Sequence, residues 1–301
     1  MVNSYKEIWI VIMNELEEKD LYLNNYKRKS FQWELWNYCL QKCVYCYLGH
    51  LNLDTLEERQ LTSLSDFNKA IDGLDFNEYN NISLIGGEFF QGECHTKQVE
   101  NELFNTLKRL AGFYKDKKVG SVWLTCTFTK EKQNILYEWL DYCKDNNMFE
   151  PNKNYGSSGL WLCTSWDAKG RFHIKEQLDN WSYHMKNIQR NYPFVKFNTT
   201  MILMEPLLID YLEDKFSIKD FIKEYKTTIF FKQPGFIGYI EPRNNGWDGD
   251  VKNTKLYFEV LKKCKIDINE KLKFNFFVNS YSFVPALFNK ITCPPLIPLD
   301  L

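Results

Sequence analysis

The sequence predicts an α/β protein whose strands run parallel. Short apolar segments alternate along the chain with longer segments in which apolar residues recur every three or four positions. This alternation is typical of parallel strands connected by crossover helices. The 301 residues are 44% hydrophobic and 17% aromatic, which suffices for one large core, alone or with an appendage. The pattern alone is compatible with a barrel and also with an open, doubly wound sheet.

Seven short apolar segments are predicted to be strands. In chain order they are residues 31–37, 81–86, 119–127, 159–165, 194–204, 227–232 and 272–278. Two polar stretches, 148–158 and 236–253, are predicted to be long loops. Loops of this length often serve as lids or as walls of a substrate site.

The segments between the strands predict amphipathic helices. Three of them carry an apolar stripe at helical spacing, formed by Leu103, Leu107, Leu110 and Ala111, by Ile135, Leu136, Trp139, Leu140 and Cys143, and by Leu178, Trp181, Met185 and Ile188. A further helix is predicted after Ser217, because Ser217 and Asp220 resemble a capping box. His184 falls within the third stripe's helix and is predicted to be structural.

The composition excludes several classes of protein. The formal net charge is −1, so the chain lacks the basic footprint of a protein that binds long nucleic acids. Its first apolar stretch is too short for a signal peptide, and no apolar run approaches the length of a membrane span. The nine cysteines are an odd number spread through the chain, unlike a secreted disulfide framework. We therefore expect a protein of the reducing cytoplasm.

Three cysteines near the start of the chain have the spacing of metal ligands. Cys39, Cys43 and Cys46 form a C-x3-C-x2-C pattern, with Tyr45 directly before the last cysteine. Three thiolates on one loop can hold a soft metal centre, an iron–sulfur cluster or zinc, and leave a fourth coordination position open. His50 could instead complete a closed, structural zinc site. The other cysteines lack close spacing, so we expect a single metal centre.

A second motif follows the second predicted strand. Residues 82–88 read ISLIGGE, an apolar run that ends in Gly86, Gly87 and Glu88. Adjacent glycines after a buried strand allow a ligand to approach the backbone, because no side chain stands in the way. A tight turn without a ligand is the alternative for this pair taken by itself.

Together, the two motifs resemble the radical S-adenosylmethionine superfamily, over roughly residues 31–235. The resemblance implies a partial (β/α)6 barrel over that range, with an N-terminal extension (1–30) and a small C-terminal extension (236–301) packed on the barrel. It implies that a [4Fe–4S] cluster is held by Cys39, Cys43 and Cys46. It also implies that S-adenosylmethionine occupies the fourth iron, with Tyr45 near the cofactor and the methionine group bound at Gly86, Gly87 and Glu88.

Further candidate residues follow the other strands, because α/β barrels bind ligands at the carboxyl ends of their strands. After the fourth predicted strand, Ser165 and Asp167 correspond to polar residues that often contact the cofactor in the family. Lys169 and Arg171 can neutralise a carboxylate or a phosphate. An ordinary strand-to-helix turn is the alternative for this stretch. After the third strand, either the two threonines or the cysteine of the run 125–127 can face the pocket.

The resemblance also implies the chemistry. The reduced cluster gives one electron to the sulfonium of S-adenosylmethionine, whose S–C5′ bond breaks to yield methionine and a 5′-deoxyadenosyl radical that abstracts hydrogen from a substrate. An electron donor such as flavodoxin or ferredoxin is implied as a partner.

The substrate class is left open by the sequence. A cysteine-rich C-terminal extension is missing, which favours a small-molecule or nucleotide-like substrate over a peptide. A peptide- or protein-modifying enzyme is the first alternative. It includes an activase of glycyl-radical enzymes. Asp167 and Lys169 weakly resemble the Asp-x-Lys motif of those activases. A non-enzymatic, zinc-stabilised interaction protein is the second.

Overall fold

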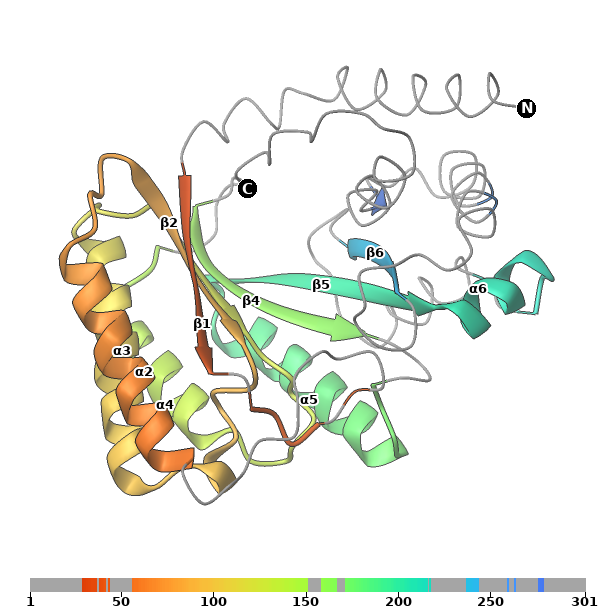
Figure 1. Cartoon of the computed structure of the whole chain (residues 1–301), viewed down its shortest axis with the longest axis horizontal. Helices are drawn as coiled ribbons and strands as arrows, with labels where there is room; N and C mark the ends of the chain where they lie inside the picture. The colour runs from red at the N-terminus through yellow and green to blue at the C-terminus, as the bar shows by residue number, and fades with distance from the viewer. Residues whose placement is uncertain are drawn as a thin grey trace.

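A computed structural model describes the structure of the protein at residues 29–36, 38–41, 43, 56–150, 158–166, 171–215, 217, 237–243, 259, 263 and 276–278. Strands and helices alternate along these residues (Figure 1). The strands are β1 (Lys29–Trp36), β2 (Tyr79–Gly86), β3 (Ser121–Thr125), β4 (Gly159–Trp166), β5 (Val195–Met204), β6 (Ile237–Arg243) and β7 (Phe276–Val278). The helices are α2 (Leu56–Asp72), the short 3-10 helix η3 (Gly92–Cys94), α3 (Lys97–Lys115), α4 (Asn134–Asp145), α5 (Lys175–Asn191) and α6 (Glu205–Leu212).

The strands form one sheet in which the spatial order equals the chain order, β1 to β7, and every neighbouring pair is parallel. A doubly wound sheet needs a point at which the strand order reverses, and these seven strands have none. Parallel connections are almost always right-handed, so a sequential order places the crossover helices on one face of the sheet. The structure is therefore an α/β fold wound in a single direction.

One face of the sheet is covered by helices and forms the core. Helices α2, α3 and α4 lie side by side along it (Figure 1). Alternate residues of the strands point into this layer, because side chains alternate between the two faces of a strand. The fully buried strand residues include Ile82, Leu84, Val122, Leu124, Leu160 and Leu162. The three apolar stripes predicted from the sequence lie in α3, α4 and α5, and all their residues are buried except the partly buried Leu178.

The opposite face of the sheet is more polar. The register places Ser83, Trp123, Trp161 and Lys196 in one row across four strands. The two indole rings are stacked, with centroids 4.6 Å apart and an interplanar angle of 4°. Lys196 Nζ lies 5.4 Å from the Trp161 ring centroid and donates a hydrogen bond of 2.7 Å to the Ser158 carbonyl. Burial lowers the pKa of Lys196.

The first five predicted strands coincide with β1 to β5 to within a few residues. The predicted strand 272–278 contains β7, whereas 227–232 lies outside the described residues. The prediction of a loop over 236–253 is wrong for β6, which occupies residues 237–243 of that stretch. Both β6 and β7 continue the sheet. The boundary predicted near residue 235 therefore does not coincide with an edge of the sheet.

Among the helices that the structure describes, none is both long and apolar enough to cross a membrane.

Candidate functional site

The cysteine loop begins at the carboxyl end of β1. Cys39 and Cys43, the first two predicted ligands, are both half-buried. Cys46 and Tyr45 lie outside the described residues, as does His50. Within the described ranges, no three His, Cys, Asp or Glu side chains gather so that they could hold a metal ion. The structure thus places two thiols of the predicted set on one loop.

The glycine pair lies directly against this loop. Gly87 N donates a hydrogen bond of 2.6 Å to the Trp36 carbonyl, and Glu88 N donates one of 3.1 Å to the Tyr38 carbonyl. A Cβ added to Gly87 would lie 1.7 Å from the Tyr38 carbonyl oxygen, and Gly86 has a φ of +113°. Glycine is required here because two backbones meet. The space that a side chain at Gly87 would fill is occupied by the Tyr38 backbone.

Glu88 is buried beneath the loops, with 1% of its surface exposed. Its carboxylate accepts hydrogen bonds from Phe90 N, at 2.8 Å, and from Thr127 N in the segment after β3. Its carbonyl accepts one of 3.3 Å from Trp36 Nε1. Burial raises the pKa of the Glu88 carboxyl, although the hydrogen bonds from Thr127 and Phe90 and the charge of Arg171 oppose the rise. Glu88 therefore joins the segment after β2 to the segment after β3.

Arg171 links the segment after β4 to the one after β3. Its guanidinium is buried and donates to the Thr127 carbonyl at 3.0 Å and to Thr164 Oγ1 at 3.4 Å. Its own carbonyl accepts a hydrogen bond from the side-chain amide of Gln41, in the cysteine loop. The prediction was that Lys169 or Arg171 faces a carboxylate or phosphate of a ligand. The Arg171 guanidinium contacts Thr127 and Thr164 of the protein, and Lys169 lies outside the described residues.

These contacts form a closed path through the segments that follow β1, β2, β3 and β4. The path runs through Tyr38, Glu88, Thr127 and Arg171 and returns to the cysteine loop at Gln41. We call it the loop circuit. In a flat sheet β1 and β4 would lie about 14 Å apart, three strand spacings. The Gln41–Arg171 contact bridges that gap at the carboxyl edge of the sheet.

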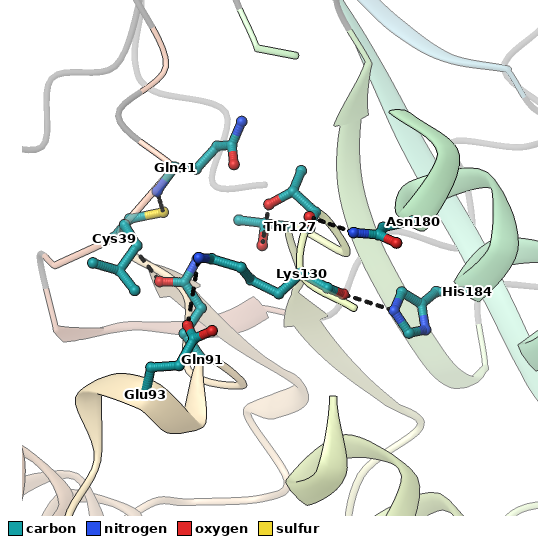
Figure 2. A network of polar contacts seen from close by, with 10 residues as sticks. Cys39, Gln41, Gln91, Glu93, Thr127, Lys130, Asn180 and His184 are labelled. Atoms are coloured by element: carbon teal, nitrogen blue, oxygen red, sulfur yellow. Dashed lines mark hydrogen bonds and ion pairs between the residues drawn. The ribbon is translucent and has the colours of Figure 1, made fainter. Parts of the chain in front are cut away.

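A second set of polar contacts runs beside the circuit and ends on α5 (Figure 2). Gln91 Oε1 accepts a hydrogen bond of 2.9 Å from Leu40 N. Glu93, two residues further on, forms an ion pair with Lys130 at 3.7 Å. His184 Nε2 donates to the Lys130 carbonyl at 2.8 Å, and its Nδ1 accepts from the Tyr137 hydroxyl at 2.8 Å. Both ring nitrogens of His184 are thus used in structure, as the sequence predicts.

The electrostatics of the cysteine loop disfavour a free thiolate. Burial, and then the charge of Glu88 and the neighbouring Cys43, raise the pKa of the Cys39 thiol to about 12. The Gln41 N–H, 3.4 Å from Cys39 Sγ, and the charge of Arg171 lower it only in part. The Cys39 thiol is therefore protonated near neutral pH and lacks the lowered pKa of a free nucleophilic cysteine.

Of the remaining predicted residues, those that the structure describes fall at the same edge of the sheet. Ser165 is half-buried near the end of β4 and pairs with Thr200 of β5, and Asp167 lies outside the described residues. In the run 125–127, Cys126 is buried in the core, whereas the Thr127 backbone belongs to the loop circuit. The sequence reasoning missed Gln41. The signal was available, because a glutamine between two predicted ligand cysteines has two side-chain groups that must be satisfied if it is buried.

Comparison of the chain with protein-family models, with curated proteins and with solved structures gives no match.

Proposed function

We propose that the protein is a radical S-adenosylmethionine enzyme. The observation that carries the proposal is the direct contact between its two motifs. The cysteine loop and the Gly86–Glu88 segment are joined by backbone hydrogen bonds from Gly87 and Glu88, although some fifty residues separate them in the chain. They meet at the carboxyl edge of a parallel sheet, where α/β proteins bind their ligands.

The proposal includes a partial (β/α)6 barrel. The sequential strand order, with helices on one face, is the order that a barrel requires. The loop circuit adds a second support, because contact between the segments after β1 and β4 is easier in a curved sheet than in a flat one. In such a barrel the helices lie outside, so the more polar face of the sheet lines the interior.

The cluster ligands of the proposal are Cys39, Cys43 and Cys46. The [4Fe–4S] cluster would supply the electron that cleaves S-adenosylmethionine into methionine and a 5′-deoxyadenosyl radical. Glu88 does not shuttle protons in this scheme, because both of its carboxylate oxygens accept backbone N–H groups and the side chain is buried. It holds the segments after β2 and β3 in place around the cofactor.

For the cofactor, we propose contacts with the Gly86–Glu88 backbone and with Tyr45, Ser165 and Asp167. Arg171 acts indirectly, since it fixes the Thr127 carbonyl. The substrate would lie against the polar face of the sheet, where one register row holds Thr125, Cys163 and Asn198. Such a row offers hydrogen bonds to a small-molecule or nucleotide-like substrate. An external electron donor, such as flavodoxin or ferredoxin, completes the scheme.

The test is anaerobic reconstitution of the full chain with iron and sulfide. We expect about four irons and four sulfides per chain, and formation of 5′-deoxyadenosine after addition of S-adenosylmethionine and dithionite. Cys43→Ala should lose the cluster, whereas Cys143→Ala, in the core of α4, should keep it. A chain that binds one zinc ion and accepts no iron would refute the proposal and favour a zinc-stabilised interaction protein. Mass spectrometry of candidate metabolites and peptides incubated with the active protein would identify the substrate.

A further inference from the structure

Gln41 is an unusual residue for its position. It stands between two predicted cluster ligands, yet only 2% of its surface is exposed. Its backbone N–H points at Cys39 Sγ over 3.4 Å. Its side-chain amide donates to the Arg171 carbonyl and, at 3.1 Å, to Gln177 Oε1. One residue therefore connects a ligand sulfur with a helix that begins more than 130 residues later.

Two residues, one just before α5 and one in its first turn, form hydrogen bonds with Gln41. His173 Nε2 donates a hydrogen bond of 3.0 Å to the Gln41 carbonyl. Gln177 Oε1 accepts both from the Gln41 amide and, at 2.8 Å, from His173 N. The main chain and the side chain of Gln41 are thus held by the same short segment. We call these three residues, Gln41, His173 and Gln177, the latch.

We propose that the latch positions the cluster loop and thereby sets the reduction potential of the cluster. This inference rests on the proposed function. Hydrogen bonds to the sulfur ligands are among the factors that tune the potential of iron–sulfur clusters, because they stabilise the more negative, reduced state. The latch holds Gln41 in the conformation that aims its N–H at Cys39 Sγ. Gln41, His173 and Gln177 are positioning residues in this account, since none of them supplies a ligand.

The donor and acceptor roles in the latch give an asymmetric prediction. Gln177 only accepts in these contacts, so Gln177→Glu keeps an oxygen where it is needed. Gln41 donates, so Gln41→Glu would bring a carboxylate against two acceptors, the Arg171 carbonyl and Gln177 Oε1. The first substitution should preserve the latch and the second should break it, although each exchanges an amide for a carboxylate. Gln177→Ala should also break it.

The experiment measures two quantities on the full chain. In reconstituted protein, redox titration followed by electron paramagnetic resonance gives the midpoint potential of the cluster. We expect a more negative potential in Gln177→Ala and Gln41→Glu, and the wild-type value in Gln177→Glu. Asp179→Ala, an exposed change on the same helix, is the control. An unchanged potential in Gln177→Ala, or equal shifts in Gln177→Ala and Gln177→Glu, would overturn the proposal.

The second quantity does not need the cluster. In metal-free protein, the rate of iodoacetamide modification of Cys39, followed by mass spectrometry, reports how often the loop opens. Loss of the two hydrogen bonds that Gln177 Oε1 accepts should raise this rate by about tenfold or more in Gln177→Ala, and Gln177→Glu should remain like wild type. Equal rates in all variants would contradict the latch itself. A faster rate in Gln177→Ala together with failure of the wild type to accept iron would refute the proposed function and leave the latch as a structural contact.

Discussion

The helix-covered core and the loop circuit lie against the same sheet, but different interactions hold them together. The core is built of aliphatic and aromatic side chains such as Leu124, Leu162 and Trp139, which are fully buried. Each contributes roughly 1.5–3 kcal/mol by leaving water. The loop circuit is made of hydrogen bonds among backbone groups and three polar side chains, those of Gln41, Glu88 and Arg171.

This difference determines how each region responds to change. Apolar packing has no direction, so a core tolerates exchanges that preserve volume. A buried hydrogen bond has a donor and an acceptor, and the loss of one partner leaves the other unsatisfied. The circuit should therefore be sensitive to substitutions that hardly alter size, whereas the core should be sensitive mainly to lost volume.

The largest effect is expected where the two backbones of the circuit meet. Gly87→Ala would place a methyl group 1.7 Å from the Tyr38 carbonyl oxygen, so the loop after β1 or the end of β2 must move. We expect a loss of about 4 kcal/mol or more in the free energy of unfolding, measured by urea denaturation. Gly112→Ala, in α3 with no heavy atom within 4 Å of the new methyl group, should stabilise by about 0.5–1 kcal/mol. Similar values for the two variants would show that the backbones do not meet as described.

The two faces of β3 offer the next comparison. Leu124→Ala removes a fully buried side chain from the helix-covered face and should cost about 2–5 kcal/mol in the free energy of unfolding. Thr125→Ala, one residue later on the opposite face, removes a partly exposed side chain and should cost less than about 1 kcal/mol. Thermal or urea unfolding followed by circular dichroism measures both. A larger cost for Thr125→Ala would mean that the helices cover the other face.

A smaller but more specific effect is expected at Glu88. Glu88→Gln keeps the size of the side chain, but its NH2 group must face one of the two backbone N–H donors of Phe90 and Thr127. We expect a loss of about 1–3 kcal/mol in the free energy of unfolding of the metal-free protein. Glu102→Gln, exposed on α3, is the matched control and should be neutral. Equal effects of the two substitutions would contradict the hydrogen bonds described for the Glu88 carboxylate.

An effect that appears only as the pH is lowered concerns His95, at the border between core and loops. Its ring meets Trp36 edge-on, and burial lowers its pKa to about 4, a shift that the charge of Glu100 opposes. Between pH 6.5 and about 4 the unfolded chain binds a proton that the folded protein does not. Stability should therefore fall as the pH decreases through this window. His95→Phe should weaken that pH dependence in urea titrations at pH 7 and pH 5, and an unchanged dependence would contradict the account.

The sequence predicted the core better than the circuit, for a physical reason. The stripes of α3 and α4 repeat every three or four residues, so the packing faces can be read from local order. Strand β6 was missed because its segment contains Pro242 and charged residues, features that argue against a strand. The circuit has no local period. It depends on contacts between residues 39 to 130 positions apart.

The same reasoning explains what could be predicted of the candidate site. The cysteines and the Gly-Gly-Glu segment were found because they form short motifs. Their partners, Thr127 and Gln177, contribute through a backbone amide or through one oxygen acceptor. Such roles place almost no constraint on the residue type, so they leave no pattern to recognise. Arg171 was found as a polar residue after a strand, but the structure gives it protein partners.

The latch also has a consequence for the order of assembly. Gln41 and its partner Gln177 are 136 residues apart, so during synthesis at roughly 5–20 residues per second the first cysteines wait about 7–27 seconds for the helix that holds them. Until then, the latch cannot form. If the proposed cluster is present, its insertion should consequently follow the folding of the first four strands, and a nascent chain stalled before residue 177 should not retain iron.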